Sequence, residues 1–203
     1  WAGVSVAGPK SREVLNNCVD DSSAVTNNNL PFMGVTSTFL KGKIPCRIAR
    51  ISFSGELAFE VYVKSDFANT MMDLLWENAK KYDGCLYGLE ALGALRVEKG
   101  HVTAAELDGR VTIDDAGLSK MASTKKSYIG SAMRKRGVLK NNDREILVGF
   151  FPANLKETFN AGTIVCEKNN IKGQGIGRIT SVTYSPELRH WIGIAVSYTH
   201  LPS

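Results

Sequence analysis

The sequence predicts an α+β domain followed by a small all-β domain, and two observations lead to this prediction. Up to Gly100, short strand-like apolar runs are mixed with segments in which apolar residues recur at helical spacing. After Lys125 the apolar runs are short, rich in β-branched or aromatic residues, and separated by Gly, Pro and Asn turns. We therefore expect helices on one face of an antiparallel sheet in residues 1–122, and strands in residues 123–203.

Local patterns define the elements of the first domain. A turn at Lys41-Gly42-Lys43 joins two strand-like runs and predicts a hairpin. Ser65-Asp66 is a candidate N-cap for a helix that reaches Asp83, and Gly100 is the expected stop of another helix. The expected strands are Val4–Ala7, Thr36–Leu40, Ile44–Phe53 and Phe59–Val63, and the other expected helices are Lys10–Cys18 and Gly88–Lys99.

The second domain is expected to consist mainly of strands, with one brief helix over Ser127–Arg136. GQGIGR (Gly173–Arg178) lacks the spacing of a dinucleotide fingerprint and leads into a strand, so it indicates a hairpin or bulge rather than a phosphate loop. A Ser-Pro turn within Ser181–Val196 indicates a second hairpin. The expected strands are Glu145–Phe151, Thr163–Glu167, Gly177–Tyr184 and Trp191–Val196.

Composition excludes several classes of protein. The 203 residues carry a formal net charge of +5, which favours an anionic ligand but is too small and dispersed to indicate nucleic acid. The cluster Arg134–Arg136 is interpreted as a solvated turn. No apolar run is long enough for a membrane helix, and the start shows no signal-peptide pattern. Because the sequence lacks an initiator Met and opens inside a strand-like run, we expect a piece of a longer chain.

The four cysteines and three histidines show no spacing typical of a metal site, a redox motif or a catalytic triad, so no metal is expected. Widely separated thiols fit a reduced, cytoplasmic protein. The acid-rich segment ELDGRVTIDDAGL (Glu106–Leu118) has two interpretations. Paired carboxylates can perform general acid–base chemistry, but Asp-Gly and Asp-Asp also form turns and helix starts, and we favour a structured connector.

RISFSGELAFEVYV (Arg50–Val63) places a carboxylate inside an apolar strand. Alternation puts Phe59 on one face, and Glu60 and Tyr62 on the other. Glu60 is then either a solvent-facing residue or a ligand anchor, because a carboxylate can accept two parallel hydrogen bonds from a pterin or guanine edge. Tyr62, or Phe53 across the turn, is a candidate to cover such a ring. Spacing alone leaves both interpretations open.

Five ordered motifs together resemble the aminomethyltransferase family, that of the glycine cleavage T-protein. They are GPKSREVL (Gly8–Leu15), ARISFSGELAFEVYV (Ala49–Val63), GLEALGALRVEKG (Gly88–Gly100), KKSYIG (Lys125–Gly130) and GRITSVTYSPELRHWIGIAV (Gly177–Val196). LRVEKGHV followed by ELDGRVTIDDAGLSKM resembles the branch that contains the alpha subunits of heterotetrameric sarcosine oxidases. Leu92 stands where the T-protein has an arginine, which fits that branch. The tail Ser197–Ser203 does not match the family.

The resemblance implies part of a three-domain cloverleaf that binds tetrahydrofolate at its centre. It implies a ferredoxin-like second domain, a β-barrel third domain, and a motif glutamate at Glu60 that binds the pterin edge. Phe53 replaces the motif tyrosine, so stacking is kept and a phenol hydrogen bond is lost. Tyr62 and Tyr184 are expected near the pocket. The family's catalytic aspartate lies upstream of Trp1, so no catalytic residue is assigned, and this chain alone is expected to be inactive.

In the sarcosine oxidase branch, the resemblance implies that an imine formed at a flavin passes its one-carbon unit to tetrahydrofolate, which gives 5,10-methylenetetrahydrofolate. Flavin and NAD are then expected only in other parts of the complex, and the expected partners are its other subunits, with no nucleic acid and no membrane. Two alternatives remain. One is a non-catalytic subunit-docking module with a degenerate pocket, and the other is a different folate-dependent demethylase or aminomethyltransferase.

Overall fold

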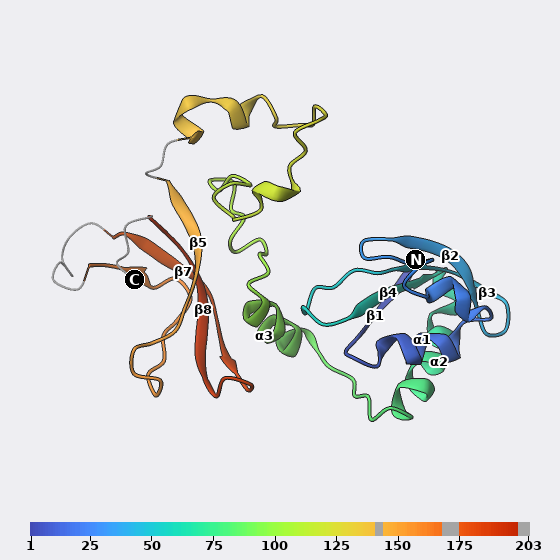
Figure 1. The fold of residues 1–203 in the computed structure, drawn as a ribbon. Helices are drawn as coiled ribbons and strands as arrows, with labels where there is room; N and C mark the ends of the chain where they lie inside the picture. The colour runs from blue at the N-terminus through green and yellow to red at the C-terminus, as the bar shows by residue number, and fades with distance from the viewer. Residues whose placement is uncertain (141–143, 168–174, 199–203) are drawn as a thin grey trace. The chain divides into compact units, whose positions relative to one another are not determined.

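The computed structural model describes residues 1–140, 144–167 and 175–198 of the chain. The chain divides into two compact units, Trp1–Leu92 and Gly93–Ser203, and each is described by itself (Figure 1). The domain boundary predicted between residues 122 and 123 is a different division from this one, and it stays a prediction. None of the helices in the described ranges is long and apolar enough to cross a membrane.

The first unit contains a four-stranded antiparallel sheet in the order β1-β4-β3-β2. The predicted hairpin is confirmed, with Gly42 and Lys43 in left-handed conformation at its turn. The strand expected to reach Phe53 ends at Ala49, because the following residues form an irregular connection in which Gly55 has a φ of 93°. The strands are β1 (Ala2–Ala7), β2 (Val35–Leu40), β3 (Ile44–Ala49) and β4 (Ala58–Val63).

Two helices, α1 (Ser11–Cys18) and α2 (Ala68–Lys80), lie side by side against this sheet (Figure 1). Short 3-10 helices occur at Ser22–Val25 (η1) and Ser65–Phe67 (η2). No side-chain N-cap bond is present at α2, because η2 occupies the place of the predicted cap. The core is formed by buried residues of α1, α2 and the sheet, including Val14, Leu15, Cys18, Leu40, Ile48, Phe59, Val61, Val63, Met71 and Leu75.

The burial pattern along β4 confirms the predicted alternation. Phe59, Val61 and Val63 are fully buried on the face that the helices cover. Glu60 and Tyr62 are half-buried and lie on the opposite, outer face of the sheet. The predicted separation of a core face from a polar face in this strand is therefore correct.

The second unit contains another antiparallel sheet, in the order β5-β8-β7-β6, and the larger part of an α-helix that begins before the boundary between Leu92 and Gly93. Helix α3 (Leu89–Lys99) ends at Gly100, whose φ of 73° is typical of a helix stop, as predicted. Val97 of α3 packs on Ile192 and Ile194 of the sheet. The strands are β5 (Glu145–Phe150), β6 (Ile164–Val165), β7 (Gly177–Ser185) and β8 (His190–Tyr198). Since β5 and β6 end this row of described strands, a closed barrel stays a prediction.

Between α3 and β5, residues 100–140 are largely irregular. Within this described range the short 3-10 helices are η3 (Ser119–Met121), η4 (Met133–Lys135) and η5 (Gly137–Lys140). The predicted helix over Ser127–Arg136 is wrong. Gly130 has a φ of 92° there, and the apolar side chain of Ile129 is exposed, so no apolar face is buried. Within GQGIGR, residues 173 and 174 lie outside the described residues, as do 199–203 of the tail, and β7 begins at Gly177.

Candidate functional site

The outer face of β4 carries the functional groups predicted in the first unit. In the antiparallel register, Tyr62 lies between Gly3 of β1 and Arg47 of β3. Glu60 lies opposite Ser5 of β1. Both polar side chains therefore have small residues as their neighbours on the β1 side.

Glu60 and Tyr62 contact each other directly. The Tyr62 hydroxyl donates a hydrogen bond to Oε2 of Glu60. This bond, together with partial burial and the nearby carboxylate charge, raises the pKa of the Tyr62 phenol above its ordinary value. Each carboxylate oxygen has two acceptor positions, so Glu60 can bind Tyr62 and still accept two parallel N–H donors.

Phe53 lies in the connection between β3 and β4 and is half-buried. The next residue, Ser54, is 7% exposed, and its hydroxyl has no hydrogen-bond partner within the part of the chain that the structure describes. Most buried hydroxyl groups have a hydrogen-bond partner, which is either another protein group or an ordered water molecule, so the Ser54 hydroxyl is unusual. The position of Phe53 in the loop that leads into the strand of Glu60 is compatible with the predicted stacking, which stays a prediction.

Tyr184 belongs to the second unit. It lies near the end of β7, where its exposed ring packs edge-to-face against Trp191 of β8, with centroids 6.0 Å apart. The structure therefore brings Glu60 and Tyr62 together, with Phe53 in an adjoining loop. The role of Tyr184 beside the same ligand stays a prediction.

The acid-rich segment after α3 is a set of ion pairs and hydrogen bonds. Glu106 is fully buried, and its Oε2 accepts hydrogen bonds from Arg96 Nη1 (3.0 Å) and from the Thr103 amide and hydroxyl (2.8 and 3.0 Å). Its Oε1 accepts one from Ser181 of β7 at 2.5 Å. Burial alone would raise the pKa of Glu106, but these donors and the charge of Arg96 together lower it. Glu106 therefore ties the end of α3 to the sheet as a carboxylate.

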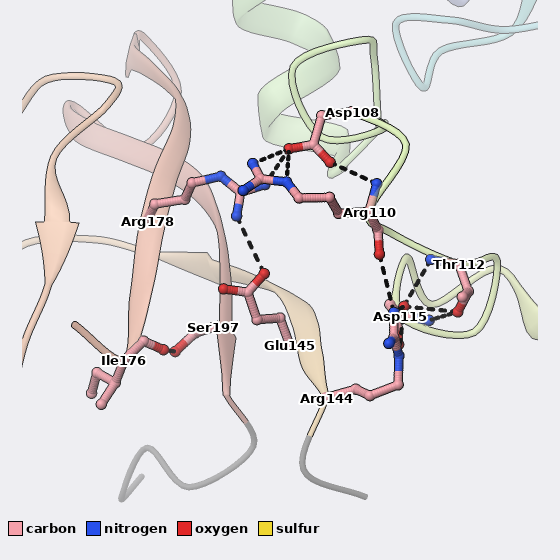
Figure 2. Close-up of polar contacts among 9 residues, drawn as sticks. All are labelled: Asp108, Arg110, Thr112, Asp115, Arg144, Glu145, Ile176, Arg178 and Ser197. Atoms are coloured by element: carbon pink, nitrogen blue, oxygen red, sulfur yellow. Dashed lines mark hydrogen bonds and ion pairs between the residues drawn. The ribbon is translucent and has the colours of Figure 1, made fainter. Parts of the chain in front are cut away.

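Two further carboxylates of this segment, Asp108 and Asp115, bind arginines of the sheet region, as Figure 2 shows. Arg178 Nη2 lies 2.7 Å from Asp108 Oδ2, and its Nη1 lies 3.2 Å from Glu145 Oε2. Arg144 binds both oxygens of Asp115, with contacts of 2.9 and 2.5 Å (Figure 2). These pairs join the connector to β5 and β7, because Arg144 directly precedes β5 and Arg178 lies in β7.

The remaining carboxylate, Asp114, is bound by Arg134 through contacts of 2.6 and 2.7 Å and by the Ser119 hydroxyl at 2.7 Å. These hydrogen bonds lower the pKa of Asp114 to about 2. All four acids of the segment are thus held as ionised partners of hydrogen-bond donors, which supports a structured connector over an acid–base pair.

Two threonine–acid pairs of the connector form local hydrogen bonds that their spacing in the sequence could have predicted. Thr103 and Glu106, and likewise Thr112 and Asp115, are spaced as Thr-x-x-acid. In both pairs the acid accepts a hydrogen bond from the threonine amide, and the Asp115 amide also donates to the Thr112 hydroxyl at 3.3 Å. In the Thr112–Asp115 pair the two bonds are reciprocal, which is the capping-box arrangement and is recognisable from sequence. The Glu106 amide donates instead to the Thr103 carbonyl.

The fold is that of an α+β unit followed by a second unit with its own antiparallel sheet. The structure superposes on the glycine cleavage system aminomethyltransferase T from Bartonella henselae with a TM-score of 0.75 and 21% sequence identity. The match covers 94% of this chain and 50% of that protein, and it shows the fold.

The family model described as the GCVT N-terminal domain matches residues 1–126, and the chain therefore belongs to this family. The chain is 36% identical to sarcosine oxidase subunit alpha of Rhizobium meliloti over 200 residues, which cover 97% of this chain and 20% of that protein. It is 29% identical to the aminomethyltransferase of Oceanobacillus iheyensis, with 99% of this chain and 54% of the relative covered. The chain thus spans about one fifth of the sarcosine oxidase subunit and about half of the aminomethyltransferase.

Proposed function

We propose that this chain is the tetrahydrofolate-binding, one-carbon transfer module of a sarcosine oxidase-type alpha subunit. In this proposal it accepts the methylene unit of oxidised sarcosine, and the product is 5,10-methylenetetrahydrofolate. The observation that carries the proposal is the Glu60–Tyr62 pair on the outer face of β4. The similarity to a sarcosine oxidase alpha subunit over 97% of the chain supports the choice of branch.

The residues on this face fit a pterin ring. A pterin edge presents an amino group beside a ring N–H, and a carboxylate matches these two donors with its two oxygens. Glu60 is half-buried, so a hydrogen bond to it is less exposed to competition from water than one at an open surface. Phe53, in the loop that leads into β4, is the proposed stacking residue.

The contribution of this chain is proposed to be binding and orientation. When bound, tetrahydrofolate supplies the amine nitrogen atoms that take up the one-carbon unit. Glu60 fixes the ring edge and so determines where those nitrogens face, and such positioning can supply a large part of a rate enhancement. The flavin and NAD chemistry is assigned to other parts of the complex, and the other subunits of the oxidase are the proposed partners.

The proposal also includes the finer architecture. Residues 1–122 form the ferredoxin-like folate-binding domain and residues 123–203 form the β-barrel domain of a three-domain cloverleaf. The division agrees closely with the end of the family match at residue 126.

A subunit-docking module without a ligand is the second candidate function. The apolar side chains of Met121, Ile129 and Val138, in the irregular segment before β5, are exposed, and in this second function they would be covered by another subunit. The two functions differ in one property, which is binding of a folate to the outer face of β4.

The test is a titration of the full-length protein with folinic acid, a stable folate. Replacing Glu60 by Gln removes the charged acceptor, and the expected loss of binding free energy is about 1.5–3 kcal/mol. The matched control is Glu77→Gln, which changes an exposed glutamate of α2 and should leave binding unchanged. If Glu60→Gln binds as tightly as the wild type, the anchor is misassigned. If the wild type binds no folate, the docking function is favoured.

A further inference from the structure

Gly3 lies directly beneath the Tyr62 ring. A Cβ atom built on Gly3 would lie 2.8 Å from Cε1 and 2.9 Å from Cδ1 of Tyr62, which is closer than real Cβ atoms come to other atoms. Gly3 does not have the left-handed backbone conformation that would itself require glycine. Gly3 therefore allows the Tyr62 ring to occupy a space that any other side chain at residue 3 would partly fill.

This close approach explains the direction of the Tyr62 side chain. Gly3 is the register partner of Tyr62 across the β1–β4 ladder, so the ring can lie down over the neighbouring strand. Glu60 lies two residues before Tyr62 on the same face, and the hydroxyl of the seated ring reaches its Oε2 atom. A ring lifted by a Cβ atom on Gly3 would carry the hydroxyl away from Glu60.

The other neighbour of Tyr62 does not provide an alternative partner for its hydroxyl. Arg47 lies opposite Tyr62 on β3, and its guanidinium stacks over the Trp1 ring, 4.9 Å from the ring centroid. On the β1 side the nearest residues, Gly3 and Ser5, carry no charge. Glu60 is thus the charged group that the Tyr62 hydroxyl contacts.

We propose that Gly3 is a positioning residue of the folate site, because it seats the ring of Tyr62 and Tyr62 in turn holds the carboxylate of Glu60. The proposal rests on the proposed function of Glu60 as the pterin anchor. A glutamate on a strand has several side-chain rotamers, and a hydrogen bond to one oxygen reduces the ordering that ligand binding must impose. The arrangement leaves Oε1, and the second acceptor position of Oε2, for a ring edge with two adjacent N–H donors.

The first experiment needs no ligand. Fluorotyrosine is placed at residue 62 of the full-length protein, and fluorine NMR follows its deprotonation with pH. We expect the wild type to deprotonate at a higher pH than free fluorotyrosine, and both Glu60→Gln and Gly3→Ala to shift the transition to lower pH. The matched control is Gly149→Ala, which changes a glycine in β5 that has open space for a Cβ atom and should leave the transition unchanged. An unchanged transition in Gly3→Ala overturns the inference.

A second experiment covers the case in which Gly3→Ala lowers stability. Gly3→Ala is expected to lower the thermal unfolding midpoint when Tyr62 is present, and to have little effect in the Tyr62→Ala background. An equal decrease in both backgrounds shows that Gly3 acts on the strand and not on the ring, which overturns the inference.

The third measurement connects the positioning to the ligand. Gly3→Ala is expected to weaken folinic acid binding about three- to tenfold, the worth of one typical hydrogen bond, and to have no further effect once Glu60 is Gln. An unchanged affinity in Gly3→Ala overturns the inference. If the wild type binds no folinic acid, the proposed function fails, while the fluorine titration still decides whether Gly3 positions Tyr62.

Discussion

Replacement of Glu106 by Gln should destabilise the second unit strongly, although the two side chains have nearly the same shape. The Glu106 side chain is fully buried and receives four hydrogen bonds, one of them from Arg96, whose side chain is only 13% exposed. Ser181 also accepts a bond from Arg96 Nη2 at 2.6 Å, so its hydroxyl is already arranged to donate to Glu106. A neutral amide would place N–H donors against this set of donors.

The magnitude follows from the charge that is left behind. Removing one partner of a buried ion pair costs about 3–5 kcal/mol, because the other charge stays buried without compensation. Since Arg96 keeps some contact with solvent, we expect about 3 kcal/mol, which is a large fraction of the stability of a typical domain. The control is Glu77→Gln, since Glu77 and Lys80 form a pair whose side chains are 65% and 46% exposed. Its expected effect is within about 0.5 kcal/mol.

The assay is hydrogen exchange with mass spectrometry on the full-length protein, which reports the local free energy of opening. Glu106→Gln should lower protection in peptides from α3 and β7, and Glu77→Gln should not. Because the folded-state pKa of Glu106 is lowered, its contribution is present above the ordinary glutamate pKa and is lost as pH falls through the folded-state value. Equal protection in Glu106→Gln and Glu77→Gln would refute the reasoning.

Three further predictions concern other parts of the chain. The pKa of Asp114, about 2, means that its ion pair supports stability above about pH 4 and is lost as pH falls toward 2, so Asp114→Asn should flatten the fall of the unfolding midpoint in this range. Gly177→Ala should destabilise the protein by about 1–3 kcal/mol, because its Cβ atom would lie 2.6 Å from the backbone oxygen of Val196. Gly149→Ala should change the stability far less, because a Cβ atom there has open space, and chemical denaturation measures both variants. Mass spectrometry after maleimide treatment at pH 8 should find exposed Cys85 modified, and buried Cys18, whose pKa is raised to about 11, unmodified until the protein unfolds.

Sequence patterns predicted the regular elements well where local periodicity and turn chemistry agree. The hairpin at Lys41–Lys43 and the stop of α3 at Gly100 are confirmed. Each expected strand has an observed counterpart, but the one expected to reach Phe53 ends at Ala49. The pattern failed over Ser127–Arg136, where one 3-10 turn replaces the expected helix. Helical spacing there is not supported by an apolar face that could be buried, and most helical stability comes from such packing.

In the candidate site, too, the relations between residues close in the sequence could be predicted, and those between distant residues could not. Alternation within β4 placed Glu60 and Tyr62 on one face, because that relation depends on residues two positions apart. The connector could not be resolved in this way. Asp114 pairs with Arg134, which is 20 residues away in the sequence, and Asp108 pairs with Arg178, which is 70 residues away. These pairs therefore depend on the tertiary fold. The contact between Gly3 and Tyr62 likewise depends on the β1–β4 register.

The central claim is that Glu60 binds the edge of a pterin ring. The most direct measurement is a structure of the full-length protein with folinic acid bound. We predict that both carboxylate oxygens of Glu60 lie within hydrogen-bond distance of the amino group and the adjacent ring nitrogen of the pterin, and that Tyr62 still contacts Oε2. Folinic acid bound elsewhere, with Glu60 paired only to Tyr62, would contradict it.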